Sequence, residues 1–117
     1  MPHHAYVVWS NPDAGRDDEY SDWYNNRHLA DVVAVPGFVS AQRCRLRDPA
    51  AEVAPVQRFM AIYTLDTDDP ECAIAQLTKL VGSDEMNMSE ASSMEDMAAN
   101  LYEAITPAIR FEAGEDV

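Results

Sequence analysis

Residues 23–38 read WYNNRHLADVVAVPGF, a helical pattern that ends abruptly. The stretch belongs to a longer segment, residues 16–35, that contains no proline or glycine. Acidic residues 17–19 crowd the start of this segment, as they do near helix N-termini, and Pro36 and Gly37 stop it. The sequence therefore predicts one long helix, followed at once by a strand.

Within this predicted helix, His28 lies near the middle of the apolar face. On a wheel of about 100° per residue, Tyr24 precedes it and Val32 follows it on the same arc, while Trp23 and Arg27 flank the arc. An imidazole at such a position is either a hydrogen-bonded core residue or an acid-base group. The wheel alone leaves both interpretations open.

The rest of the chain predicts a second helix and four strands. The helix is expected over residues 71–81, with Asp69 as its N-cap and Pro70 in its first turn. The strands are expected at residues 4–9, 38–47, 56–65 and 102–111. Residues 84–97, rich in Met, Ser and Glu, fit either a loop or a short helix. The order β-α-β-β-α-β is typical of the α+β ferredoxin-like fold, a four-stranded antiparallel sheet with both helices on one face.

The second strand alternates between two sets of side chains, and the third is apolar on both sides. Phe59, Tyr63 and their neighbours face one way, and Met60 and Ile62 face the other. Two helices cover only one sheet face, so the other face is expected to pair with a second copy in a homodimer.

Composition bounds the class of protein. The chain has 117 residues, which predicts a single domain over residues 1–117. A formal net charge of −13 argues against nucleic acid and anionic membranes as partners, and no apolar run approaches the ~20 residues of a membrane span. The N-terminus lacks a secretory pattern, so a cytoplasmic location is expected.

The charge is unevenly distributed. Residues 1–64 carry 8 acids and 6 bases, for a net charge of −2, whereas residues 65–117 carry 13 acids and 2 bases, for a net charge of −11. Three of the bases, Arg43, Arg45 and Arg47, alternate along the second strand and are expected to be solvated ion pairs.

Familiar metal and cofactor motifs are absent. Cys44 and Cys72 lack CxxC spacing and are expected to be buried thiols rather than zinc ligands or a disulfide. The sequence contains no GxGxxG, GxxxxGK[ST], HExxH or GxSxG, and His3 and His4 stand together at the terminus. No metal and no cofactor are therefore predicted. A single histidine on a helix is weak support for an axial haem ligand.

Residues Trp23 to Val32, followed by Val35-Pro36-Gly37-Phe38, resemble the EthD-like branch of the dimeric α/β-barrel superfamily. The resemblance implies a barrel of two sheets at a dimer interface and a pocket in each subunit between helices and sheet, with His28 pointing into it. The family often has proline two residues after this histidine, where this chain has Ala30.

The resemblance also implies roles for the candidate site residues. His28 would act as acid-base catalyst, and Tyr24 would donate a hydrogen bond to a carbonyl or enolate oxygen. Contacts to a small hydrophobic or aromatic ligand are assigned to Tyr6, Trp9, Trp23, Arg27, Phe59, Tyr63 and Tyr102.

Three functions fit these residues. The main hypothesis is a cofactor-independent lyase, isomerase or cyclase that moves a proton on an aromatic, polyketide or lactone-like substrate. One alternative is a non-catalytic protein that binds a hydrophobic metabolite or serves in assembly. The other is a cofactor-free monooxygenase.

Overall fold

The computed structural model describes residues 3–47, 57–83, 86 and 92–110, the side chains of residues 92–96 excepted. Its elements follow the predicted order of strands and helices. They are β1 (His3–Pro12), α1 (Asp17–Trp23), the π-helical turn η1 (Tyr24–His28), α2 (Leu29–Val33), β2 (Phe38–Arg45), β3 (Phe59–Asp66), α3 (Pro70–Leu80) and β4 (Ser92–Glu103).

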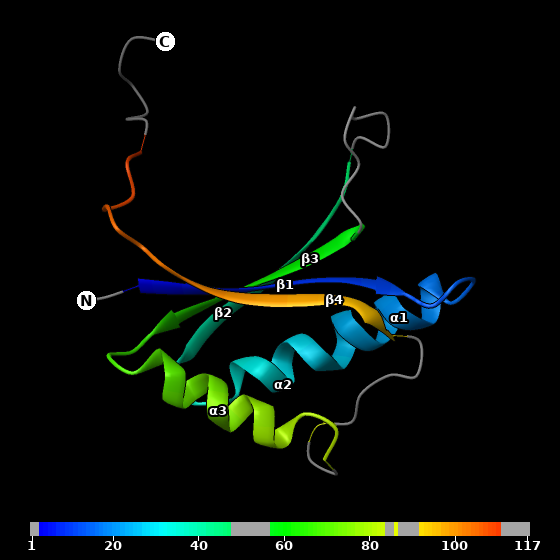
Figure 1. The fold of residues 1–117 in the computed structure, drawn as a ribbon, viewed down its shortest axis with the longest axis horizontal. Helices are drawn as coiled ribbons and strands as arrows, with labels where there is room; N and C mark the ends of the chain where they lie inside the picture. The colour runs from blue at the N-terminus through cyan, green and yellow to red at the C-terminus, as the bar shows by residue number, and fades with distance from the viewer. Residues whose placement is uncertain (1–2, 48–56, 84–85, 87–91, 111–117) are drawn as a thin grey trace, which may run out of the picture.

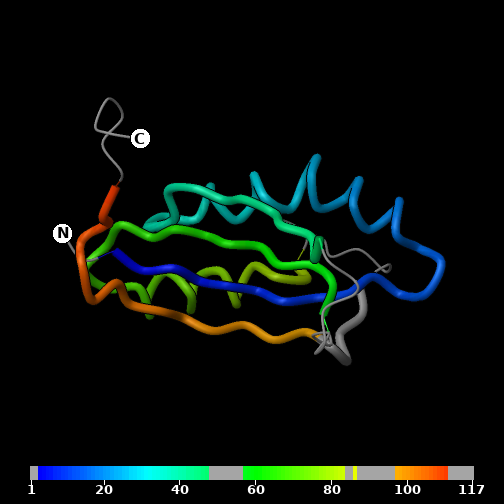
Figure 2. Tube along the Cα trace, turned by 90° about the horizontal axis from the view of Figure 1, so that it is seen from above, coloured from blue at the N-terminus to red at the C-terminus, as the bar shows by residue number. Residues whose placement is uncertain are grey.

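The four strands form one sheet in the order β2-β3-β1-β4, with every neighbouring pair antiparallel. Figure 1 shows all the helical segments on one side of this sheet, and Figure 2 shows the strands lying side by side. The predicted ferredoxin-like α+β fold is confirmed.

The sequence predicts the position of the first long helix correctly but not its geometry. It is α-helical at both ends and π-helical between Tyr24 and His28, where the N–H of Leu29 bonds to the carbonyl of Tyr24. In a uniform α-helix, residues spaced by four drift by about 40° at each step. The wider π turn offsets that drift, so Tyr20, Tyr24, His28 and Val32 are all buried against the sheet.

The predicted start of the second helix is confirmed. The Asp69 carboxylate accepts a hydrogen bond from the N–H of Cys72 at 3.1 Å, and Pro70 occupies the first turn. These two residues satisfy or remove N–H groups that would otherwise lack partners at the helix end. The Cys72 side chain itself is exposed, so the prediction of a buried thiol is wrong there, and Cys44 is only half-buried.

Strand β4 was expected at residues 102–111 and is found at Ser92–Glu103. Its central residues Ala98 and Ala99 are small, with weak intrinsic preference for strands, and pairing with β1 decides their conformation. The prediction of loop or helix at residues 84–97 is wrong for residues 92–97, and most of its remainder lies outside the described residues. The sequence also predicts a break between the second and third strands at residues 48–52, which lie outside the described residues.

A bulge between Phe38 and Ser40 reverses the expected faces of β2. Phe38 pairs with Leu65 and Ala41 pairs with Tyr63, so both lie on the helix side. Beyond the bulge, Arg43 faces the helices and Cys44 faces the other way, which is the opposite of what strict alternation from Phe38 predicts.

The face of the sheet away from the helices, here called the outer face, is uneven in polarity. Near the end of β1, Cys44, Met60 and Trp9 lie side by side on neighbouring strands. Toward the start of β1, the outer-face positions include Ser40 and Thr64. The outer face is therefore apolar from Val7 and Ile62 to the Trp9 end and more polar at Ser40 and Thr64. Among the described residues, no helix is long and apolar enough to span a membrane.

Gly37 sets the approach of the first helix's end to α3. Its φ is +101°, and a Cβ placed there would lie 3.0 Å from the Ala73 Cβ. We expect Gly37→Ala to lower the free energy of unfolding by about 3 kcal/mol, since a strained φ and overpacking each cost about 1–3 kcal/mol. Gly15→Ala is the matched control, because Gly15 has a φ of +81° but a Cβ placed there would meet nothing within 4 Å. Urea unfolding of both variants measures the difference, and equal losses would contradict the packing argument.

Candidate functional site

A cavity of about 90 Å³ lies between the first helix, the sheet and α3. Trp23, Tyr24 and His28 line it from the helix. Its other walls include Tyr6, Ser10 and Tyr63 from the sheet, Leu77 and Val81 from α3 and the residue after it, and Met97 from β4. The lining is mostly apolar and aromatic, with a few hydroxyl groups and one imidazole.

His28 is only 7% exposed and is held between two aromatic rings. Its ring stacks on Trp23 at 4.5 Å between centroids and meets Tyr24 edge-on at 5.1 Å. Within the described residues its Nδ1 is buried and has no hydrogen-bond partner. Burial lowers the pKa of His28 to about 4, against a smaller opposing effect of the Asp31 carboxylate. The imidazole is therefore neutral at pH 7, and in the tautomer protonated on Nε2 its Nδ1 is free to accept a hydrogen bond.

The two neighbouring tyrosines share a hydrogen bond at the same cavity. The Tyr63 hydroxyl donates to the Tyr24 hydroxyl at 3.4 Å. Burial raises the pKa of Tyr24 to about 12, although the bond from Tyr63 acts in the opposite direction. Burial also raises the pKa of Tyr63. Both phenols stay protonated at neutral pH, and Tyr24, which accepts from Tyr63, keeps its own O–H to donate to an oxygen in the cavity.

Arg43 is a residue that sequence reasoning assigned to the solvent and the structure places under the helix. Its guanidinium lies 4.7 Å from the ring centroid of Tyr24 and donates from Nη1 to the Asn25 side chain at 2.7 Å. Tyr20 and Phe59 surround the same guanidinium, at 5.3 and 5.1 Å. The bulge in β2 turns Arg43 inward, and no local sequence signal marks that bulge.

The structure brings together five of the nine predicted site residues. Their side chains line the cavity, and they are Tyr6, Trp23, Tyr24, His28 and Tyr63. The roles assigned to them stay predictions.

The other four predicted residues lie elsewhere. Trp9 and Tyr102 stand on the outer face, where their rings contact each other edge-on at 6.4 Å. Successive side chains of a strand point to opposite faces of the sheet. Trp9 is an odd number of residues from both Tyr6 and Ser10, so it lies on the other face. Arg27 is exposed and lies 3.6 Å from Asp31, the ion pair that its spacing predicts. Phe59 lies on the helix side but packs on Tyr20 instead of lining the cavity.

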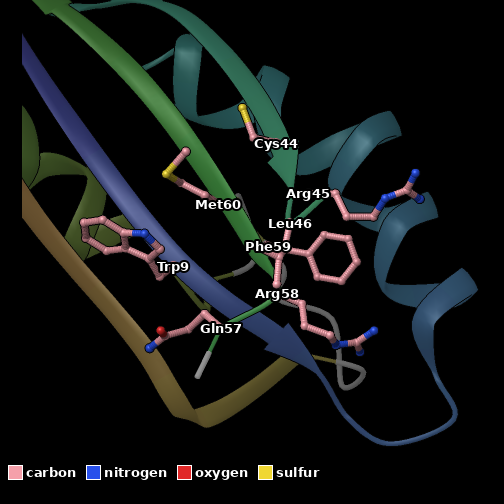
Figure 3. A pocket seen from close by; sticks show the side chains of 8 residues that line it. All are labelled: Trp9, Cys44, Arg45, Leu46, Gln57, Arg58, Phe59 and Met60. Carbon is pink, nitrogen blue, oxygen red and sulfur yellow. The ribbon is translucent and has the colours of Figure 1, made fainter. Parts of the chain in front are cut away.

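A second hollow, here called the outer hollow, lies at the Trp9 end of the outer face. Its volume is about 170 Å³, and Trp9, Cys44, Leu46 and Met60 contribute to its lining. Figure 3 shows Trp9 and Met60 on one side of the strands and the side chains of Arg45, Arg58 and Phe59 extending the other way. The arginines therefore do not converge on this hollow.

The cavity at His28 is suited to proton transfer on a small group. Its 90 Å³ falls below the ~300–1,000 Å³ of drug-sized ligand sites, so a group as large as haem does not fit it. Among the described residues, no group of three or more His, Cys, Asp or Glu side chains is placed to hold a metal ion. The cavity presents a neutral imidazole with an unpartnered Nδ1 and the Tyr24 hydroxyl, which can donate a hydrogen bond.

No protein-family model matches this sequence, and comparison with curated proteins gives no match. Solved structures do match. A candidate monooxygenase from Shewanella loihica PV-4 aligns with a TM-score of 0.58 at 16% identity, over 92% of this chain and 97% of that one. MhuD, a heme-degrader from Mycobacterium tuberculosis solved with two hemes in its active site, gives 0.61 at 17%, over 90% and 98%.

A third match is an ethyl tert-butyl ether D (EthD) family protein from Bacillus halodurans C-125, with a TM-score of 0.52 at 15% identity, over 90% of this chain and 100% of that one. At such identities the likeness concerns the fold. The chain therefore shares its ferredoxin-like fold, nearly end to end, with proteins described as a monooxygenase, a heme-degrader and an EthD family member.

Proposed function

We propose that this protein is an EthD-like small-molecule enzyme whose reaction begins when His28 removes a proton from a bound substrate. One observation carries the proposal: a buried, neutral imidazole with an unpartnered Nδ1 lies in a small aromatic cavity. A buried polar atom without a partner costs free energy, so a ligand that donates a hydrogen bond there would recover part of it.

In the proposed first step, Nδ1 accepts a proton from a C–H or O–H group of the substrate. Tyr24, 5.1 Å from His28 between ring centroids, donates a hydrogen bond to the oxygen that gains negative charge. The low pKa of His28 in the free protein does not prevent this step, because an anion forming beside the imidazole favours its protonated form.

The reaction class proposed is cofactor-independent oxygenation, the alternative that the monooxygenase and heme-degrading neighbours support better than a lyase or isomerase. The carbanion formed at an activated CH₂ group would reduce dioxygen. One oxygen atom enters the product as a carbonyl, and the other leaves as water with the two hydrogens of that carbon. The balance is CH₂ + O₂ → C=O + H₂O, so no external reductant is required.

We expect His28→Gln to lower kcat by roughly 10²-fold or more with a smaller effect on KM, because a general base acts on the transition state. Tyr24→Phe should lower kcat by a smaller factor, because it removes one neutral hydrogen bond. A panel of small carbonyl compounds that carry an activated CH₂ group, followed by oxygen uptake and by substrate loss, provides the assay.

His3→Gln is the matched control, because it makes the same change at an exposed histidine at the start of β1. Substrate loss without oxygen uptake would assign the lyase or isomerase class instead. A folded His28→Gln protein with full activity would exclude the role of His28 as base. Ligand binding without any turnover would identify a binding protein.

The pH dependence follows from the depressed pKa of His28. We expect kcat/KM, which reports the free enzyme, to stay level from about pH 8 to pH 5 and to fall as the pH drops through about 4, since protonation removes the base. Titration of the His28 resonance by NMR, identified by its loss in His28→Gln, should give the same midpoint. A midpoint near the ordinary value of about 6.5 would show that burial does not control this group.

We also propose that the protein is a homodimer joined through the outer face of the sheet. The apolar Trp9 end of that face is not covered by any helix of the described residues (Figure 1). Light scattering at micromolar concentration should give twice the chain mass of 13.0 kDa. A stable species at the monomer mass would refute the pairing.

A further inference from the structure

The chain beyond β4 carries two isoleucines into the solvent. This C-terminal arm, residues 104–110, starts beside the first residue of β1, where the N–H of Ala104 bonds to the carbonyl of His3 at 2.9 Å. Ile105 is 90% exposed and Ile109 is 92% exposed. Figure 1 shows the arm, coloured orange to red, running away from the body on the side of the sheet opposite the helices. Such exposure of two large apolar side chains is costly unless another surface covers them.

The outer hollow offers a surface of matching chemistry. It lies between Trp9, Met60 and Cys44, which are direct neighbours across three strands. Its volume of about 170 Å³ is comparable to the ~150 Å³ cavity that admits a benzene molecule, so one branched aliphatic side chain fits.

An arm does not reach the outer hollow of its own chain in this structure. The arm begins at His3, and the hollow lies at Trp9, about 20 Å away along β1 at ~3.3 Å per residue. Consider a dimer whose two-fold axis lies between two facing sheets and runs perpendicular to their strands. In such a dimer, the start of β1 in one copy lies opposite the end of β1 in the other copy. The partner's arm is then brought to the end of the sheet where the hollow lies.

We propose that the C-terminal arm of each protomer docks on the outer face of a second copy, with Ile109 inserted into the partner's outer hollow. This proposal depends on the homodimer proposed above and identifies one contact between its two protomers. The exchange is reciprocal, so each dimer contains two such contacts.

The first test replaces both arm isoleucines in the full chain, as Ile105→Asp with Ile109→Asp. Because burial of one isoleucine accounts for roughly a 10- to 100-fold change in an equilibrium constant, we expect the dimer dissociation constant to rise at least 100-fold. Sedimentation equilibrium measures it. Thr106→Asp is the matched control, since it adds a charge to the same arm without removing an apolar side chain, and it should change the constant much less.

The second test uses the native Cys44 of the hollow as a trap. In a Cys72→Ser background, which removes the exposed thiol, Ile109→Cys should form a disulfide-linked dimer under mild oxidation. Adding Cys44→Ser should abolish that dimer on a non-reducing gel. Thr106→Cys in the same background is the control for random collision.

The outcomes separate the two proposals. A wild-type protein that is monomeric overturns both the homodimer and the arm contact. A wild-type dimer whose constant is unchanged by the double aspartate substitution, and which gives no Cys44-dependent crosslink, overturns the arm contact alone. A Cys44-dependent disulfide within one chain also overturns it, because the arm would then fill its own hollow.

Discussion

The site depends on four helical residues, spaced by four, that must face one sheet at the same time. Tyr20, Tyr24, His28 and Val32 are each less than a tenth exposed. A uniform α-helix cannot keep so long a row on one face, because the row drifts around the axis. One π turn at Tyr24–His28 corrects the drift where the chemistry is concentrated. The imidazole and the Tyr24 phenol consequently share a cavity instead of pointing into different parts of the protein.

Burial, more than any charged neighbour, determines what these groups can do. The largest influence on the pKa of His28 and of Tyr24 is loss of water, which favours the neutral form of both. Arg43 brings a positive charge close to Tyr24, yet it is separated from the cavity lining by that ring. The result is a site whose acceptor and donor are both uncharged before a ligand arrives.

Sequence reasoning found the elements whose signals are local. The Pro36-Gly37 stop, the Asp69 cap and the position of His28 on the apolar arc all follow from neighbouring residues. It failed where pairing between distant strands decides the outcome. The bulge that turns Arg43 inward and the placement of Ala98 in a strand depend on β3 and β1 as partners. The error at Trp9 is of another kind, because alternation along β1 already places Trp9 on the face opposite Tyr6. The sequence does not predict the π turn either, because the same residues fit an ordinary α-helical wheel.

Gly37 links this fold to the range of molecules that such a cavity can admit. Its missing side chain lets the turn after α2 touch α3 at Ala73, and α3 supplies Leu77 to the cavity wall one turn further on. The close approach of this turn to α3 is thus made at residues that are not part of the cavity lining. Exchanges at the Gly37 and Ala73 pair would shift α3, and Leu77 with it, without replacing His28 or Tyr24, so the shape of the cavity and its polar groups can change independently in related sequences.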